Sequence, residues 1–175
     1  MYRFHLILTL LFSASQLFAQ EPNLLIYGKV NDWSTGDSIP FPSVQFQDVT
    51  SGSLPMLVVP NSHGRYEFVL DVESIFKIIY SAPGKVSKFV QIDTRGPTAQ
   101  DWKGGHGMVL NVALLDTLPG IDFSVLKEPF GCCKWNPKRT IFEWERDYSK
   151  AMAKRQEELM QAYEKAKFSS TKPVK

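Results

Sequence analysis

Histidine and cysteine, which supply much of enzyme and metal chemistry, are scarce in this chain. It has three histidines and two cysteines in 175 residues, and only His63 and His106 follow residue 19. A catalytic zinc needs about three protein ligands, and neither histidine lies in an H-E-x-x-H arrangement. No G-x-S-x-G elbow is present, and the Gly-rich residues 104–107 lack the Lys-Ser/Thr of a phosphate loop. The sequence therefore predicts a protein that is not an enzyme, with no catalytic, metal or cofactor-binding residue and both histidines solvated in loops.

A strong charge of either sign is also missing. The formal net charge is +2 at pH 7, whereas nucleic-acid binding relies on clustered Lys and Arg that neutralise phosphates. Nucleic acid is therefore not expected as a partner. Long apolar runs are absent too, apart from one at the N-terminus, so no transmembrane segment is expected once that segment is removed.

The N-terminal run has the three parts of a secretory signal peptide. Arg3 supplies the positive charge, residues 4–12 are almost wholly apolar, and Ala19 precedes a polar break. The run is far shorter than the ~20 residues that span a bilayer. We expect residues 1–19 to be cleaved and the rest to be exported, as a periplasmic or secreted protein or one peripheral to the outer membrane.

The next hundred residues alternate between short β-like segments and turn signals. Turns are indicated at residues 35–37, 61–64, 82–84 and 103–105. Short alternating strands with regular turns and no helical pattern are typical of an antiparallel sandwich. We therefore expect a β-sandwich over residues 24–118, in which the following side chains are buried: Val30, Val44, Phe46, Phe68, Ile78, Phe89, Val109 and Val112.

The character of the sequence changes after residue 118. Residues 119–139, with two prolines and an adjacent cysteine pair, predict an irregular connector. Residues 140–168 contain neither Pro nor Gly and predict one amphipathic helix, with Thr140 as N-cap and Glu143 at the capping-box spacing. Its apolar stripe consists of Trp144, Tyr148, Met152, Leu159 and Tyr163, and residues 169–175 are expected to be a disordered tail.

Four motifs carry a resemblance to a known family. They are residues 26–30 (IYGKV), 35–44 (TGDSIPFPSV), 61–68 (NSHGRYEF) and 81–85 (SAPGK). In this order they resemble the carboxypeptidase regulatory-like domain, a transthyretin-like (prealbumin-like) seven-stranded Greek-key sandwich. Lys85 departs from the pattern, where an aromatic residue is usual, and the insertion at residues 51–60 is either an extra edge strand or a loop. The resemblance implies a non-catalytic accessory or recognition module of the envelope of Gram-negative bacteria.

Cys132 and Cys133 are the residues of the mature chain with the most distinctive potential chemistry. Their Cα atoms are ~3.8 Å apart across a trans peptide, below the usual ~4.4 Å minimum for a disulfide. A vicinal bridge would be strained. The alternatives are two buried thiols beside Trp135, an intermolecular bridge, or a redox or metal role.

These features lead to three functional hypotheses. The leading one is a non-catalytic interaction or structural module of the cell envelope, which acts through the sandwich surface or the C-terminal helix. The helix is long enough to overhang the sandwich, so Leu159, Met160 and Tyr163 are expected to project toward an envelope protein or a second copy. The second is an accessory subunit or remnant of an envelope peptidase or outer-membrane transporter system. The third is a glycan-binding module that uses Trp33 and Trp102.

Overall fold

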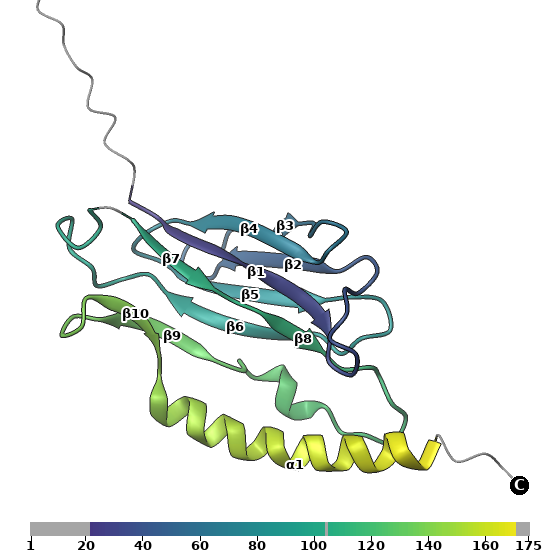
Figure 1. Cartoon of the computed structure of the whole chain (residues 1–175). Helices are drawn as coiled ribbons and strands as arrows, with labels where there is room; N and C mark the ends of the chain where they lie inside the picture. The colour runs from purple at the N-terminus through teal and green to yellow at the C-terminus, as the bar shows by residue number, and fades with distance from the viewer. Residues whose placement is uncertain (1–21, 104, 171–175) are drawn as a thin grey trace, which may run out of the picture.

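Two β-sheets and one C-terminal helix make up the protein. The computed structural model describes residues 22–103 and 105–170, so the expected signal peptide and the end of the tail lie outside the described residues. The sheets face each other, and the helix runs along one side of the sandwich (Figure 1). The mainly β class with one long C-terminal helix is thus confirmed.

The larger sheet has six strands. Their spatial order is β10 (Ile141–Trp144), β9 (Cys132–Asn136), β6 (Lys88–Asp93), β5 (Ile75–Ser81), β2 (Ser43–Asp48) and β3 (Met56–Val58). All neighbours are antiparallel except β6 and β9, which pair in parallel at residues 91–93 of β6. The insertion at residues 51–60 therefore supplies an edge strand, β3.

The smaller sheet is built around β1 (Leu24–Asp32). Strand β1 pairs with the antiparallel β4 (Arg65–Leu70) on one side. On its other side it pairs with the parallel β7 (His106–Val109) and β8 (Val112–Leu114). Between β7 and β8 the backbone of Leu110 bends toward β1, where its amide donates to the Tyr27 carbonyl at 2.8 Å. A Cβ on Gly28 would lie 1.9 Å from the Leu110 carbonyl oxygen, so only glycine allows this approach.

The sandwich core follows the expected alternation at most positions. Val30, Val44, Phe46, Ile78 and Val112 are buried as predicted. Phe68 is partly buried and stacks on Phe46 with 4.6 Å between ring centroids. The prediction that Phe89 is a core residue was wrong, because Val90 and Ile92 occupy the buried face of β6 and Phe89 lies on the other face, under the Lys77 amine.

A second core prediction, for Val109, was also wrong. Val109 is 52% exposed, and Leu110 takes the inward place instead. The cause is the strand alternation itself, because Met108, Leu110, Val112 and Leu114 share the inward face and Val109 lies on the opposite one. At the same point Tyr66 donates its hydroxyl proton to the Leu110 carbonyl at 2.6 Å, and the Tyr66 and Tyr80 hydroxyl oxygens lie 2.9 Å apart.

The expected connector and the start of the expected helix are instead largely ordered β-structure. A short 3-10 helix, η1 (Ser124–Lys127), is followed by the β9–β10 hairpin, and the α-helix α1 covers Arg146–Ser170. The prediction that Thr140 caps the helix was wrong. Thr140 lies in the turn of the hairpin, where it has a positive φ of 52° and its amide donates to the Asn136 carbonyl. Trp144 belongs to β10, although its spacing of four from Tyr148 resembles a helical repeat.

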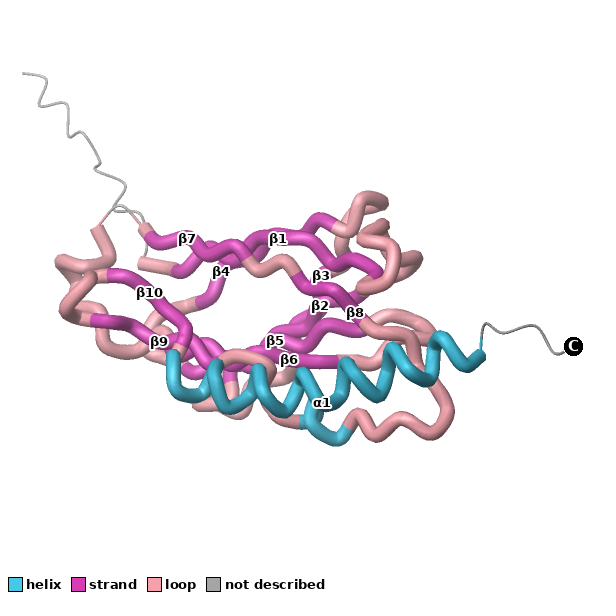
Figure 2. The backbone as a smooth tube through the Cα atoms, turned by 60° about the horizontal axis from the view of Figure 1, so that its bottom comes forward, coloured by secondary structure: helices cyan, strands magenta, loops and turns pink. Residues whose placement is uncertain are grey.

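The helix packs along its own sandwich rather than overhanging it. Tyr163 is fully buried, Met152 and Leu159 are buried, and Met160 is partly buried. The prediction that Leu159, Met160 and Tyr163 project to a partner was therefore wrong. The reason is that α1 runs lengthwise from the β9–β10 hairpin along the sandwich and past the end of β8 (Figure 2), and its apolar side packs against Leu115, Val125 and Leu126.

A cluster of polar groups fixes the far end of the helix. The Lys85 ammonium group forms ion pairs with Asp32 and Asp116. The backbone amide of Asp116 donates to the Tyr163 hydroxyl oxygen at 3.2 Å, and that hydroxyl lies 3.4 Å from the Asp116 carboxylate. The helix is thus joined by hydrogen bonds to the segment that follows β8.

Because the helix stripe belongs to the core, truncating it should destabilise the protein. Leu159→Ala is expected to lower the free energy of unfolding by about 2–5 kcal/mol, as measured by urea denaturation. Phe168→Ala on the same helix is the matched control, since Phe168 is 76% exposed and its loss should have little effect. Equal stability of the Leu159 variant and the wild type would contradict the docked helix.

Candidate functional site

The adjacent cysteines are free thiols on β9. Successive side chains of a strand point to opposite faces, and accordingly Cys133 is buried while Cys132 is partly buried. Burial raises the pKa of Cys133 to about 12, and the nearby Glu143 carboxylate acts in the same direction. Burial also raises the pKa of Cys132. In this structure the two sulfur atoms are free, and burial favours the protonated thiol at both positions.

The two histidines lie in different surroundings. His63 is exposed in the turn before β4, as expected. His106, which was expected to be solvated, instead lies in β7 with its Nε2 atom 2.8 Å from the Asp101 carbonyl oxygen, so this nitrogen carries the proton. Its ring centroid lies 5.2 Å from that of Trp135 and 5.6 Å from that of Phe142. His106 therefore belongs to an aromatic cluster that attaches the β9–β10 hairpin to β7.

The aromatic residues considered for glycan stacking are not both available. Trp102 is only 6% exposed because it packs in the same cluster, 5.3 Å from His106 and 5.7 Å from Phe142 between ring centroids. Trp33 is 39% exposed, but it meets Tyr163 edge-on at 5.8 Å. The prediction that Trp102 is a free stacking surface was wrong, because the hairpin, which the sequence did not reveal, covers it.

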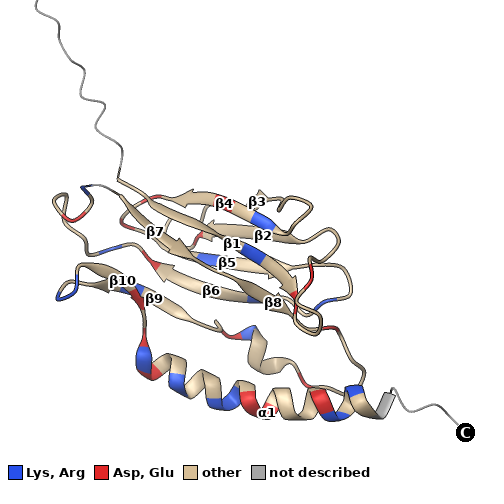
Figure 3. Cartoon of the chain, viewed as in Figure 1, with Lys and Arg blue, Asp and Glu red and all other residues tan. Residues whose placement is uncertain are grey.

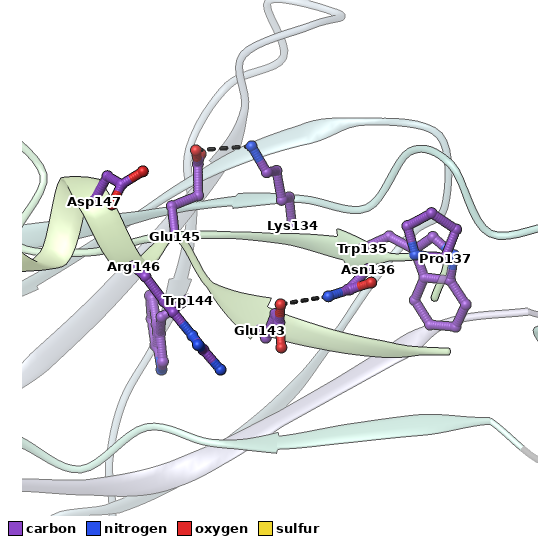
Figure 4. Close-up of a pocket in the computed structure, with 9 residues that line it drawn as sticks. All are labelled: Lys134, Trp135, Asn136, Pro137, Glu143, Trp144, Glu145, Arg146 and Asp147. Atoms are coloured by element: carbon purple, nitrogen blue, oxygen red, sulfur yellow. Dashed lines mark hydrogen bonds and ion pairs between the residues drawn. The ribbon is translucent and has the colours of Figure 1, made fainter. Parts of the chain in front are cut away.

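The hairpin carries a hollow of about 380 Å³ on its outer side (Figure 4). Three of its five charged lining residues, Lys134, Glu143 and Glu145, take part in ion pairs. Lys134 donates to Glu145 at 2.7 Å, and Glu143 accepts from Asn136 at 2.5 Å and from Arg139 at 2.7 Å. The hydrogen bond from Asn136 lowers the pKa of Glu143. The hollow thus has an ionised, paired carboxylate rather than a general acid with a raised pKa.

The described residues contain neither a metal-type cluster nor a membrane-spanning helix. No group of three or more His, Cys, Asp or Glu side chains among them could hold a metal ion. None of the helices in this part of the chain is both long and apolar enough to cross a bilayer.

The exposed apolar surface is concentrated at β3, which we call the β3 edge and define as residues 54–59. Leu54, Met56, Leu57 and Val59 are between 59% and 86% exposed. β3 ends the six-stranded sheet, so its outer backbone groups have no neighbouring strand. The sequence has no Asp, Glu, Lys or Arg from residue 49 to residue 64, and β3 accordingly has no charged segment in Figure 3. Edge strands are usually guarded by charge, so this edge has the features of a contact surface.

A second unusual group is a lysine on the inner side of the sandwich. Lys88 pairs with Tyr80 across β5 and β6 and precedes Val90 and Ile92 on the inward side of its strand. Its Nζ atom lies 4.8 Å from the centroid of the Phe130 ring, and none of the ion pairs among the described residues involves it. Burial lowers the pKa of Lys88 from its ordinary 10.5 to about 8.

Comparisons with known proteins give only distant matches. No protein-family model matches the chain, and no curated protein matches it. Among solved structures, catechol 1,2-dioxygenase from Acinetobacter sp. ADP1 is 14% identical with a TM-score of 0.43, over 65% of this chain and 59% of that one. Hydroxyquinol 1,2-dioxygenase from Pseudomonas putida is 10% identical with a TM-score of 0.42, over 57% and 58%. A DUF3823 family protein from Parabacteroides merdae is 16% identical with a TM-score of 0.39, over 56% and 47%.

The chain thus spans less than two thirds of the length of each of these structures. At such TM-scores the matches assign neither a family nor an activity. The resemblance to the carboxypeptidase regulatory-like domain stays a prediction.

The cysteine geometry predicts a difference in thiol reactivity. A small alkylating reagent at neutral pH should modify Cys132 slowly and Cys133 only after unfolding, because Cys133 is buried and its pKa is high. Mass spectrometry of the protein purified without reductant should show two reduced thiols. A mass lower by two hydrogens, restored on reduction, would contradict this structure.

Burial of Lys88 without a counter-charge predicts that its removal stabilises the protein. Lys88→Met should raise the free energy of unfolding at neutral pH by up to ~3 kcal/mol, since one pKa unit corresponds to about 1.4 kcal/mol. This gain should shrink as the pH rises from about 8 to about 10.5, because folded wild-type protein releases the proton before the unfolded chain does. Urea denaturation of both proteins at each pH measures the difference in their free energies of unfolding. Because both proteins contain the same tyrosines, the effect of tyrosine titration on stability cancels in this difference. A variant less stable than wild type at pH 7 would show that the ammonium is well solvated.

Proposed function

We propose that this protein is an exported, non-catalytic interaction module of the cell envelope, and that its contact surface is the β3 edge. One observation carries the proposal: an unpaired sheet edge in which four apolar side chains are mostly exposed and no residue is charged. Such an edge is costly to leave open, because its free N–H and C=O groups and apolar side chains favour contact with another chain.

The geometry of β3 supports the addition of a partner strand. β3 pairs with β2 through Met56 opposite Phe46 and Val58 opposite Val44, so its other side is the one left open. In this mode of recognition the main chain supplies hydrogen bonds, and alternate side chains supply specificity. Pro55 and Pro60 flank the strand, and proline cannot donate to a ladder. The open edge is therefore short, which favours one extended peptide segment over unlimited sheet growth.

The chemistry of the described residues supports a non-catalytic role. The Glu143 carboxylate in the hairpin hollow is ionised and paired, and the Cys133 thiol stays protonated at neutral pH. The two alternative functions, an accessory subunit and a glycan-binding module, would use different surfaces of the protein. An accessory subunit of an envelope peptidase or transporter would use the same edge, whereas a glycan module would need free aromatic faces, and Trp102 is buried.

The proposal is tested by placing charge on the edge. The mature protein from residue 20 onward and its Leu57→Lys and Val59→Lys variants are used to capture proteins from an envelope extract of the native host. Val109→Lys is the matched control, since Val109 is an exposed valine on the other sheet. We expect the wild type and the control to retain the same partner, and both edge variants to lose it at an unchanged melting temperature.

A photo-crosslinking residue at position 57 identifies what occupies the edge. Crosslinks to an extended segment of a second protein would support the proposal. A crosslinked dimer of this chain alone, or capture that both edge variants preserve, would overturn it.

A further inference from the structure

The docked helix closes a cavity of about 170 Å³ against the side of the sandwich. Its walls are mainly apolar and come from five parts of the chain. Trp33 follows β1, and Ala113 belongs to β8. The other apolar walls are Val86 before β6, Leu115 after β8, Leu126 of η1, and Leu159 and Met160 of α1, all of which belong to, or pack against, the second apolar cluster of the protein. The cavity is therefore a gap at the margin of a packed interface, and it is open to solvent beside Trp33, Lys88 and Gln156, which are not fully buried.

Two polar side chains line this otherwise apolar cavity. Gln156 reaches it from the helix, and Lys88 reaches it from β6. The Phe130 ring stabilises the Lys88 cation, but none of the ion pairs of the described residues supplies it with a carboxylate. Lys88 is partly buried, and a charge withdrawn from water is ordinarily paired, so the cavity offers one positive group without a carboxylate partner beside an apolar space.

We propose that this cavity binds a small aliphatic carboxylate, with the carboxylate on the Lys88 Nζ atom and the alkyl chain among Leu126, Leu159 and Met160. The ligand supplies the negative charge that the chain lacks, and the Gln156 amide supplies a further donor. The volume is below the about 300–1,000 Å³ of usual ligand pockets, so the chain of the ligand is short. This inference is independent of the function proposed for the β3 edge.

The lining favours a carboxylate over other anions. A phosphate has more charge and more acceptor oxygens than one ammonium and one amide can satisfy. A neutral lipid or alcohol would fill the apolar part but would leave Lys88 without a counter-charge. A monocarboxylate matches both parts of the cavity.

The proposal is tested by isothermal titration calorimetry of the mature protein with sodium hexanoate and, separately, with 1-hexanol. We expect saturable hexanoate binding to the wild type. Lys88→Met should weaken hexanoate binding by at least about tenfold, as expected for the loss of a charge-assisted hydrogen bond, with hexanol binding unchanged. Lys77→Met is the matched control, because the Lys77 amine also lies over a phenyl ring, 4.2 Å from the Phe89 centroid, but does not line this cavity.

A second measurement needs no variant. Hexanoate should protect Lys88, and not Lys77, from an amine-acylating reagent, as read by peptide mass spectrometry. Absence of saturable hexanoate binding, equal hexanoate affinity of Lys88→Met and wild type, or equal acylation of Lys88 with and without hexanoate would each overturn the proposal.

Discussion

The contact between Tyr163 and Asp116 determines how the C-terminal third of the chain is placed. Tyr163 is fully buried, and its hydroxyl oxygen accepts the amide proton of Asp116. Asp116 in turn pairs with Lys85, which also pairs with Asp32 at the end of β1. Burial alone would lower the pKa of Lys85, but the hydrogen bonds to Asp116 and Asp32 raise it above its ordinary value. One cluster thus joins β1, the β5–β6 connection, the end of β8 and the helix.

This cluster gives a physical reason for the departure of Lys85 from the family pattern. An aromatic residue at that position could pack on the sandwich but could not satisfy two carboxylates. A partly buried carboxylate that loses its partner is costly. With Lys85 in place, the same turn becomes the attachment point for a helix that lies outside the resemblance.

The β-strands could largely be predicted from the sequence, because alternation and turn residues are local signals. The β9–β10 hairpin could not. Its turn has no glycine. Asn136 closes it by accepting the amide protons of Lys138 and Arg139 on its side-chain oxygen, and Thr140 adopts a positive φ. Trp144 then stands four residues before Tyr148, which is the spacing of a helix, although the helix begins only at Arg146.

The candidate surfaces were harder to predict than the fold, for two different reasons. Whether Leu159 and Tyr163 are covered depends on residues 115–127, an irregular segment whose path has no periodic signal. Lys88 shares one face of its strand with Val90 and Ile92, and Phe89 lies on the other face. The prediction that Phe89 is buried used the opposite register, which would have placed Lys88 in solvent. The sequence pattern also could not show that none of the ion pairs among the described residues includes Lys88.

The cavity beside Lys88 follows from where strand pairing stops. The backbone of residues 130–134 follows β6, with hydrogen bonds from the Phe130 amide to the Phe89 carbonyl and from the Gln91 amide to the Gly131 carbonyl. Lys88 is the next residue beyond this pairing, where the chain has turned away toward η1. Side chains of η1 and α1 therefore cover this end of β6 in place of a strand. Because side chains from several elements must meet there, they leave a gap that a hydrogen-bonded neighbouring strand would have closed.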